Sequence, residues 1–531
     1  MKKPIDEIAD RLAERVRTDA SGAKSLGHLL VVVPTAQSGR RLRLKLAERL
    51  GAFMSPEIRL PPQLVVPDAP EIAGRADELL AFREALGEKG SLDAAAQFSD
   101  IRGILGANAL SFADVAAKVG TILTDEVADV EVARWQELAE LERRYWAALA
   151  TRGKKDRIVA MKERLADPPQ LNGIETIVLA GLLDPLPALR SVVETYARRD
   201  RLEVVELLPS IPTLNPQFSI CNSQLRNSQL STLEIVPCAT AASEAAEVAE
   251  IFAAVKDDEE LPALCVADAE VFPEIQGALQ AKGLKVHDPS RTPLVTSSLG
   301  HLVEQVVALA RTRSYNVFSA FIRSGDVRRW LSSELKIAPE EYVAALTQLD
   351  NAQAKLLPEK IDDIGPKVSG KLRAIFEHVD VTLRKHGLRD ILQSVFKDHI
   401  LDERNPDARE FAAAAETVNG LIDECFAFRN RTIEQSEQSE QSNKLSLELF
   451  ALRLREASYS LEPDEGDVIL TDGWLELPFL DADELIVTGF NEGRVPESVV
   501  GHAFLPDRLR RGLGLPDNES RTVRDRTILR L

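Results

Sequence analysis

Features that are scarce or missing in this sequence argue against several classes of protein. It has four cysteines in 531 residues and no C-x-x-C pair, which argues against a zinc ribbon or a disulfide framework. No apolar run approaches the ~18 residues that a membrane-spanning helix needs. The start, MKKPIDEIADRLAERV, is charged where a signal peptide would place its apolar stretch. We therefore expect a cytoplasmic protein without a membrane partner.

Several catalytic patterns are also missing. No G-x-x-x-x-G-K-[ST] loop occurs anywhere in the chain, so no intact phosphate loop of a nucleotide hydrolase is present. The seven histidines show no metal-ligand spacing, and no Ser-His-Asp or paired-carboxylate arrangement stands out. An E-x-K triplet at 334–336 lies in a predicted helix with no strand aspartate before it, and we interpret it as chance. We expect no catalytic residue and no metal site.

The charge is acidic overall and basic at both ends. The chain carries 65 Lys and Arg against 84 Asp and Glu, a formal charge of −19. Residues 1–59 nevertheless hold twelve basic against seven acidic residues, and residues 494–531 hold eight against five. These ends are either solvated helix faces or a positive channel for nucleic acid. With 44% apolar and 28% charged residues, the composition is that of a globular protein of about three to five domains.

The first part of the chain has the pattern of an α/β domain with a helical insertion. Short apolar runs predict buried strands at His28–Pro34, Glu175–Leu182 and Leu202–Leu208. Leucine recurs every four residues from Leu42 to Leu50, which predicts a basic helix directly after the first strand. We assign residues 1–70 and 166–212 to a first α/β domain, and the charged, helical stretch 71–165 to its insertion.

The second part repeats this organisation after a polar linker at 213–232. Strands are predicted at LEIVP near Leu233, at Ala263–Asp268, at Val468–Thr471 and at Glu484–Thr488. We assign residues 233–297 and 465–531 to a second α/β domain. Residues 298–464 form its mainly helical insertion, in which the low-complexity run EQSEQSEQS at 434–442 is predicted as a mobile loop. The fold class is therefore α/β, with two parallel-sheet domains.

The turn after the first predicted strand stands where a phosphate loop would lie. It reads PTAQSGRR from Pro34, so proline replaces the first glycine, Gly39 keeps the second, and Arg40 and Arg41 replace the lysine and the hydroxyl residue. Proline lacks a backbone donor and arginine cannot bind Mg²⁺, so we do not expect ATP or magnesium here. This segment, with Thr35, is either a plain strand-to-helix turn or a contact for DNA phosphates.

A second motif of nucleotide hydrolases is missing in the right place. Such enzymes end a strand with Asp-Glu, which supplies a metal ligand and orients water. The segment TIVLAGLLD has Gly181 and Leu182 at that point, and Asp184 stands alone before a proline. Two lost motifs in order indicate a hydrolase core that no longer hydrolyses.

The C-terminal stretch resembles a known family. TGFNEGRVPE (Thr488 to Glu497) resembles motif V of UvrD-type superfamily-one helicases, and NESRTVRDRTILRL (Asn518 to Leu531) resembles their motif VI in a degenerate form. Together with FLPDRLRRGLGLPDNESR from Phe504 and VVVPT from Val31, the pattern is most similar to AddB-type subunits of bacterial helicase–nuclease complexes. The resemblance covers nearly the whole chain in domain order, although only the C-terminal motif is specific.

This resemblance implies an inactivated helicase fold with two RecA-like domains. The family processes DNA double-strand ends and single-stranded tails for recombinational repair, beside an AddA-type motor subunit. Its members are cytoplasmic bacterial proteins associated with the nucleoid. Its C-terminal PD-(D/E)XK nuclease domain would begin where this sequence stops. An iron–sulfur cluster and a nuclease metal are therefore expected only if such a domain exists, and in these residues we expect neither.

The resemblance also singles out candidate residues near the C-terminus. Motif VI of an active helicase brings an arginine to the γ-phosphate. Without a working phosphate loop, its arginines here are interpreted either as DNA backbone contacts or as interface salt bridges. The turn at the end of the last predicted strand lies where open α/β folds bind ligands. The candidates are Gly489, Asn491, Glu492, Gly493, Arg494, Arg521, Arg524 and Arg526.

The sequence thus predicts a non-hydrolysing, helicase-like DNA-binding scaffold of an AddB-like subunit. Two alternatives stay open. One is an active ATP-dependent helicase of the UvrD type, and the other is a protein-interaction scaffold without DNA binding. A fold of this kind supports many tasks, so the family resemblance alone does not establish the function.

Overall fold

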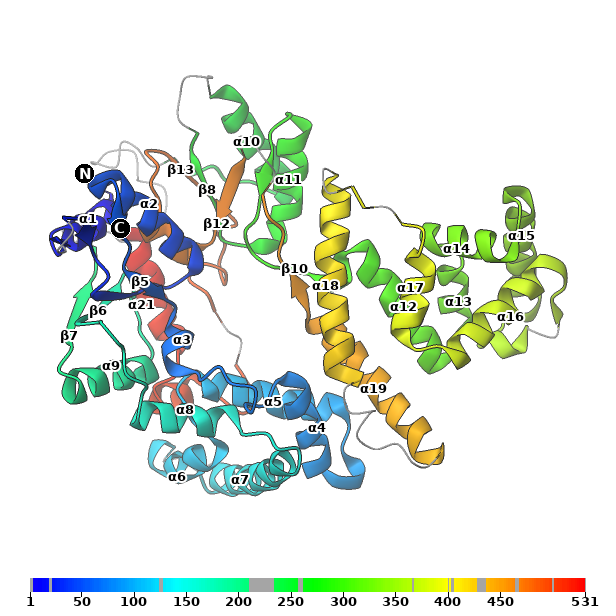
Figure 1. The fold of residues 1–531 in the computed structure, drawn as a ribbon, viewed down its shortest axis with the longest axis horizontal. Helices are drawn as coiled ribbons and strands as arrows, with labels where there is room; N and C mark the ends of the chain where they lie inside the picture. The colour runs from blue at the N-terminus through cyan, green and yellow to red at the C-terminus, as the bar shows by residue number, and fades with distance from the viewer. Residues whose placement is uncertain are drawn as a thin grey trace. The chain divides into compact units, whose positions relative to one another are not determined.

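A computed structural model describes residues 3–18, 22–123, 128–209, 234–255, 261–364, 367–399, 401–402, 405–426, 436–463, 468–498 and 501–530. These residues form a mixed α/β protein with two four-stranded parallel sheets (Figure 1). The chain divides into two compact units. The first consists of Met1–Asp288 and Asp464–Leu531, and the second of Pro289–Pro463. Both parallel sheets belong to the first unit.

The first sheet has the strand order β5-β3-β6-β7, with every neighbouring pair parallel. Its strands are β3 (Leu29–Val32), β5 (Glu57–Arg59), β6 (Thr176–Ala180) and β7 (Glu203–Leu207). All residues of β3 and β6 are buried, as expected for central strands covered on both faces. The predicted strands in this part of the chain are therefore confirmed.

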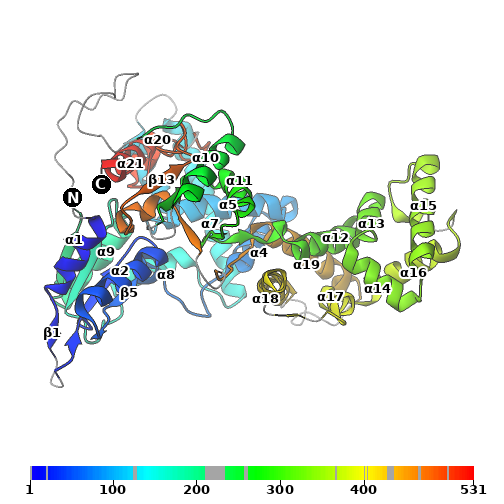
Figure 2. The ribbon, with the colours of Figure 1, turned by 90° about the horizontal axis from the view of Figure 1, so that it is seen from above.

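Helices cover the two faces of this sheet (Figures 1 and 2). On one face, α1 (Pro4–Ala13) and α2 (Ala36–Leu50) bury Leu12 and Leu42 against Val31. On the other face, α9 (Pro187–Arg199) buries Val192 against Leu30. Since successive residues of a strand point to opposite faces, neighbours in β3 serve different cores.

Five longer helices fill most of the segment between β5 and β6. They are α4 (Arg75–Ala85), α5 (Leu92–Gly106), α6 (Phe112–Ile122), α7 (Ala128–Thr151) and α8 (Arg157–Ala166), preceded by the short α3 (Pro61–Val65). The Arg102 guanidinium lies at their centre, where it pairs with Glu142 and, at 2.7 Å, with Asp156. All three side chains are almost fully buried, so the charges compensate one another inside the helical core.

The second sheet has the strand order β13-β8-β12-β9 and is also parallel throughout. Its strands are β8 (Ala263–Val266), β9 (Val286–His287), β12 (Ile469–Asp472) and β13 (Leu485–Thr488). The helices α10 (Ala241–Ala254) and α11 (Phe272–Ala281) pack on one face. Between β12 and β13 lies the 3-10 helix η7 (Trp474–Phe479), and α20 (Asp507–Gly512) and α21 (Asn518–Arg530) follow β13. A small separate sheet joins β1 (Arg17–Thr18), β2 (Lys24–Ser25) and β4 (Phe53–Met54).

The second unit is mainly helical. Its helices are α12 (Ser298–Thr312), α13 (Tyr315–Phe321), α14 (Gly325–Leu335), α15 (Pro339–Leu356), α16 (Gly370–Lys385), α17 (Leu388–Phe396), α18 (Pro406–Phe426) and α19 (Ser436–Glu456). One antiparallel pair joins β10 (Thr292–Pro293) to β11 (Ser458–Tyr459). The apolar stripe of α12 is buried, which is what its helical spacing indicates.

Two predictions of local structure were wrong. The segment LEIVP was predicted as a strand, but its described residues Glu234–Pro237 belong to no strand, and Ile235 is 68% exposed. The run at 434–442 was predicted as a loop, whereas its residues from Ser436 onward lie in α19. Glutamate and glutamine are good helix formers, so a repetitive polar run can continue a helix. The predicted linker at 213–232 lies outside the described residues.

Candidate functional site

The segment that the sequence predicts as a degenerate phosphate loop forms a capped helix start. Thr35 is the N-cap of α2, and its Oγ1 accepts the Ser38 backbone N–H at 3.1 Å. The Ser38 side chain is fully buried, with its hydroxyl 2.9 Å from that of Thr35. Pro34 precedes this turn and has no N–H to offer. A hydroxyl of the protein thus satisfies one backbone donor that a phosphate loop would direct at its ligand.

Gly39 lets α2 approach the sheet closely. A Cβ atom at this position would lie 3.0 Å from Ile58 of β5 and 3.3 Å from Val33 at the end of β3. Both distances are shorter than ordinary carbon–carbon contacts. The glycine that corresponds to the phosphate loop is therefore explained by helix–sheet packing alone.

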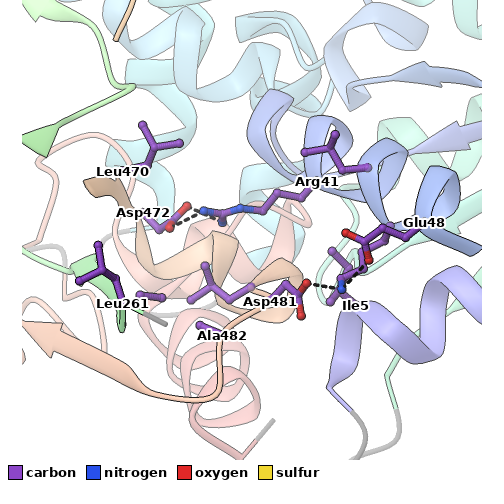
Figure 3. A pocket seen from close by; sticks show the side chains of 12 residues that line it. Ile5, Arg41, Glu48, Leu261, Leu470, Asp472, Asp481 and Ala482 are labelled. Atoms are coloured by element: carbon purple, nitrogen blue, oxygen red, sulfur yellow. Dashed lines mark hydrogen bonds and ion pairs between the residues drawn. The ribbon is translucent and has the colours of Figure 1, made fainter. Parts of the chain in front are cut away.

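Arg41 spans the distance to the second sheet. Its two terminal nitrogens lie 2.5 and 2.6 Å from the two carboxylate oxygens of Asp472, in a bidentate pair (Figure 3). Asp472 is the last residue of β12, and its side chain is 1% exposed. Burial raises the pKa of the Asp472 carboxyl, and the Arg41 guanidinium opposes that shift. Arg41 is therefore an internal counter-ion and is not free to bind a ligand.

Arg40 differs from its neighbour. Its side chain is exposed, as is that of Arg43 one turn later, and no acidic partner contacts either one among the described residues. The first turn of α2 also contains no acidic residue. These two arginines are the part of the basic helix that remains available to an external anion.

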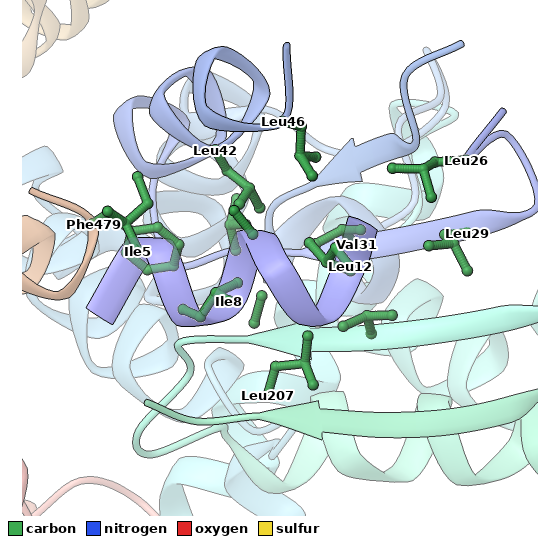
Figure 4. Close-up of a cluster of buried hydrophobic side chains, with 14 residues drawn as sticks. Ile5, Ile8, Leu12, Leu26, Leu29, Val31, Leu42, Leu46, Leu207 and Phe479 are labelled. Carbon is green, nitrogen blue, oxygen red and sulfur yellow. The ribbon is translucent and has the colours of Figure 1, made fainter. Parts of the chain in front are cut away.

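The crevice at the carboxyl end of the first sheet is closed by the chain itself. The helices after β3 and β6 cover opposite faces, so this is the point where open α/β sheets bind ligands. Here the Phe479 ring lies against Gly181, at which a Cβ atom would meet ring carbons at 2.5 Å. Gly181 has φ +64°, and Phe479 is fully buried in the first core (Figure 4). Asp184, which stands near the expected acid, is exposed.

Glu476, in the same 3-10 helix as Phe479, has its carboxylate near the Thr35 side chain. Burial raises the pKa of Glu476, the interaction with Thr35 opposes the shift, and the nearby Asp472 carboxylate adds to it. An acidic group in this position repels phosphate, so the loop presents a surface unsuited to a nucleotide.

A cavity of about 280 Å³ lies beside these contacts, between α2 and the second sheet (Figure 3). Its wall is both apolar and charged, with Leu44, Leu261 and Leu470 beside five charged lining residues. The basic groups in the wall are paired, since Arg41 contacts Asp472 and Lys45 contacts Asp481. The cavity therefore offers no free cation to select an anionic ligand.

The turn after β13 is held by acidic groups of the second sheet. Gly489 has φ +69° and donates its N–H to Glu244 at 2.6 Å. A Cβ atom at Gly489 would lie 2.6 Å from that of Asp268, so only glycine fits there. Arg494 pairs with Asp268 at 3.0 Å and with Glu270 at 2.7 Å. Of the predicted residues of this turn, Gly489 and Arg494 thus interact with acidic side chains of the chain itself.

The side chains of Asn491 and Glu492 are exposed on the same turn, and Gly493 has φ +84°. They lie at the carboxyl end of β13, as predicted. These exposed groups include no cation, so by themselves they do not form a phosphate-binding surface.

The arginines of α21 fall into two groups. Arg521 lies 3.4 Å from Glu497, and Arg524 donates to Asp525 at 2.7 Å. Arg526 is exposed and has no acidic partner among the described residues. Arg521 and Arg524 thus have acidic partners within the same C-terminal segment, and whether the arginines of α21 serve as DNA contacts or as interface salt bridges stays a prediction.

Sequence reasoning missed Asp472, Glu476 and Phe479. They lie in and after β12, far along the sequence from Arg41, Thr35 and Gly181, the residues that they contact. The only signal was the segment GWLELPF between two predicted strands, which is too apolar for an exposed turn.

No protein-family model matches this chain, and no curated protein is similar to it. No group of three or more His, Cys, Asp or Glu within the described ranges is placed to hold a metal ion. In the same ranges, no helix is both long and apolar enough to cross a membrane.

Proposed function

We propose that this protein is a non-hydrolysing, helicase-like DNA-binding scaffold, similar to the N-terminal part of an AddB-type subunit. Its two parallel sheets would then be two RecA-like domains, each interrupted by a helical insertion. The observation that carries the proposal is the closure of the first sheet's ligand crevice by Phe479 and Glu476. A partner of the AddA type supplies ATP hydrolysis, and the pair processes DNA double-strand ends for recombinational repair.

Three features argue against nucleotide binding by this chain. Phe479 occupies the space beside Gly181, Arg41 is neutralised by Asp472, and the carboxylate of Glu476 lies against the loop hydroxyl. Phosphoryl transfer needs a cation and a bound metal where the charge develops. Here a carboxylate and a phenyl ring occupy that place.

DNA binding is proposed for the unpaired arginines of α2 and α21, the two helices that carry the candidate residues of the sequence. Arg40 and Arg43 on α2 and Arg526 on α21 are exposed guanidinium groups that no acid of the described chain neutralises. Such groups contact phosphates without reading sequence, and they make the affinity depend on salt. Because the whole protein is acidic, a few free arginines would decide where DNA can approach.

The test is binding of the full chain to a fluorescent DNA end with a single-stranded tail. Fluorescence anisotropy is measured between about 50 and 200 mM salt, with and without Mg-ATP. We expect salt-dependent binding that Mg-ATP does not change. In the double variant Arg40→Gln/Arg43→Gln, the steepness of the plot of log affinity against log salt should decrease by about 1.4 to 1.8, since two phosphate contacts are lost.

The matched control is Arg83→Gln/Arg157→Gln, which removes the same charge from exposed positions on α4 and α8. It should bind like the wild type. Equal losses of DNA affinity in both double variants would mean that the effect comes from net charge alone. Absence of binding at low salt would leave the protein-interaction scaffold, and an affinity that ATP changes would favour the active helicase.

A further inference from the structure

The segment between β12 and β13 belongs to the cores of both sheets. Phe479 at the end of η7 packs among Ile5, Leu42 and Ala180 in the first core (Figure 4). Trp474 at the start of η7 packs with Cys265 of β8 and Ile528 of α21 in the second. Only four residues therefore separate two aromatic anchors that are buried in different cores.

Ion pairs flank the same segment on both sides. Before it, Asp472 pairs with Arg41 of α2. After it, Asp481 pairs with Lys45 of α2 and, at 3.1 Å, with Lys3. Buried or half-buried pairs of this kind are screened by salt much less than surface pairs. The N-terminal helices thus hold the segment at three points, two charged and one apolar.

We propose that residues 472–481 are a built-in brace that holds the two parallel sheets of this unit in one arrangement. Proteins that enclose a ligand between two domains use its contacts to close them, and its loss to open them. Here Phe479 supplies the contact at the first sheet permanently, so closure needs no nucleotide. This inference concerns the rigidity of the unit and does not depend on DNA binding.

Hydrogen exchange of the full chain tests the brace. In the wild type, the amides of residues 36–42 and 474–480 should be protected, and Mg-ATP should not change their exchange. Phe479→Leu keeps an apolar side chain but removes the ring contact with Gly181. We expect exchange at least roughly tenfold faster in both segments, because α2 and η7 open together.

Leu475→Ala is the matched control, since Leu475 lies in the same 3-10 helix and is 41% exposed. It should exchange like the wild type. Protection of α7, which lies in the helical part of the unit, should stay unchanged in both variants and shows that they are folded. Equal exchange in Phe479→Leu and Leu475→Ala would overturn the brace. Faster exchange in 36–42 alone would also overturn it, because that is only a defect in the first core.

The charged contact gives a second, independent measurement. Arg41→Gln and Asp472→Asn should each speed exchange in both segments. In the double variant, the increase in exchange rate should be smaller than the product of the two single increases, because a neutral pair can hydrogen-bond again. Strictly multiplicative effects would overturn the coupling. A change of exchange on adding Mg-ATP to the wild type would overturn permanent closure. None of these readouts involves DNA, so their failure is distinguishable from failure of the proposed function.

Discussion

The helices α2 and α21 both carry rows of arginines, but the surroundings of those arginines differ. Arg41 and Arg521 are exposed to a similar degree, 18% and 17%. The partner of Arg41 is a carboxylate that is 1% exposed, whereas the partner of Arg521, Glu497, is 50% exposed. When the arginine is removed, water can solvate the carboxylate of Glu497 but not that of Asp472. We therefore expect these similar arginines to contribute very differently to stability.

Each helix also carries arginines without a partner, Arg40 and Arg43 on α2 and Arg526 on α21. The comparison thus separates two roles within one residue type. A paired arginine determines how the unit is held together, and an unpaired arginine is available to phosphate. Substitutions at neighbouring positions can test whether the two roles are separable.

The largest effect is expected for Arg41→Gln. It leaves the buried carboxylate of Asp472 without its counter-ion, which should lower the free energy of unfolding by about 3 kcal/mol. Arg40→Gln, one residue earlier, should change it by less than about 0.5 kcal/mol. Denaturant unfolding of both variants checks this. Similar values for the two would mean that the pair with Asp472 contributes little.

A smaller effect, dependent on pH, is expected for Glu476→Gln. Burial raises the folded-state pKa of Glu476 above its ordinary value of 4.5, so this group favours folding most below that pH. The contribution of Glu476 to the free energy of unfolding falls as the pH rises toward the folded-state pKa, and it is constant at higher pH. Glutamine has nearly the same shape and does not titrate, so the variant should become more stable relative to wild type as the pH rises from about 4 to neutral. Thermal unfolding of both proteins across that range gives the difference curve, and a flat curve would contradict the prediction.

Arg521→Gln should cost less than Arg41→Gln. Its partner Glu497 is half exposed, so the expected loss is about 0.2 to 1 kcal/mol in denaturant unfolding. High salt should remove most of that difference, since exposed pairs are screened. A loss as large as that of Arg41→Gln would erase the contrast between the two helices.

The smallest effect on stability, within about 0.5 kcal/mol, is expected for Arg526→Gln. In DNA binding, the same change should decrease the steepness of log affinity against log salt by about 0.7 to 0.9, as expected for one lost phosphate contact. Arg83→Gln serves as the control, because it removes one exposed charge from α4. Unchanged DNA binding by Arg526→Gln would assign the DNA contact, if any, to α2 alone.

Much of the secondary structure could be predicted because it is encoded locally. The buried strand at Leu29–Val32 and the helix from Ala36 follow from an apolar run and a four-residue leucine repeat. The short strands β5 and β9 were missed, because two or three residues give no periodicity. The wrong prediction at 436–442 shows the limit of composition, since polar repeats suit both a loop and a helix.

The amino-acid sequence alone predicts a degenerate phosphate loop and an alternation of strands and helices, and it shows that both ends are basic. Which basic residues are free depends on the folded chain. Arg40 and Arg41 are adjacent and chemically identical, but a carboxylate 431 positions away neutralises one of them. Nothing local distinguishes the two, because the distinction arises when β12 is placed beside α2. The availability of a charge depends on burial and on its nearest partner, and both are properties of the folded chain.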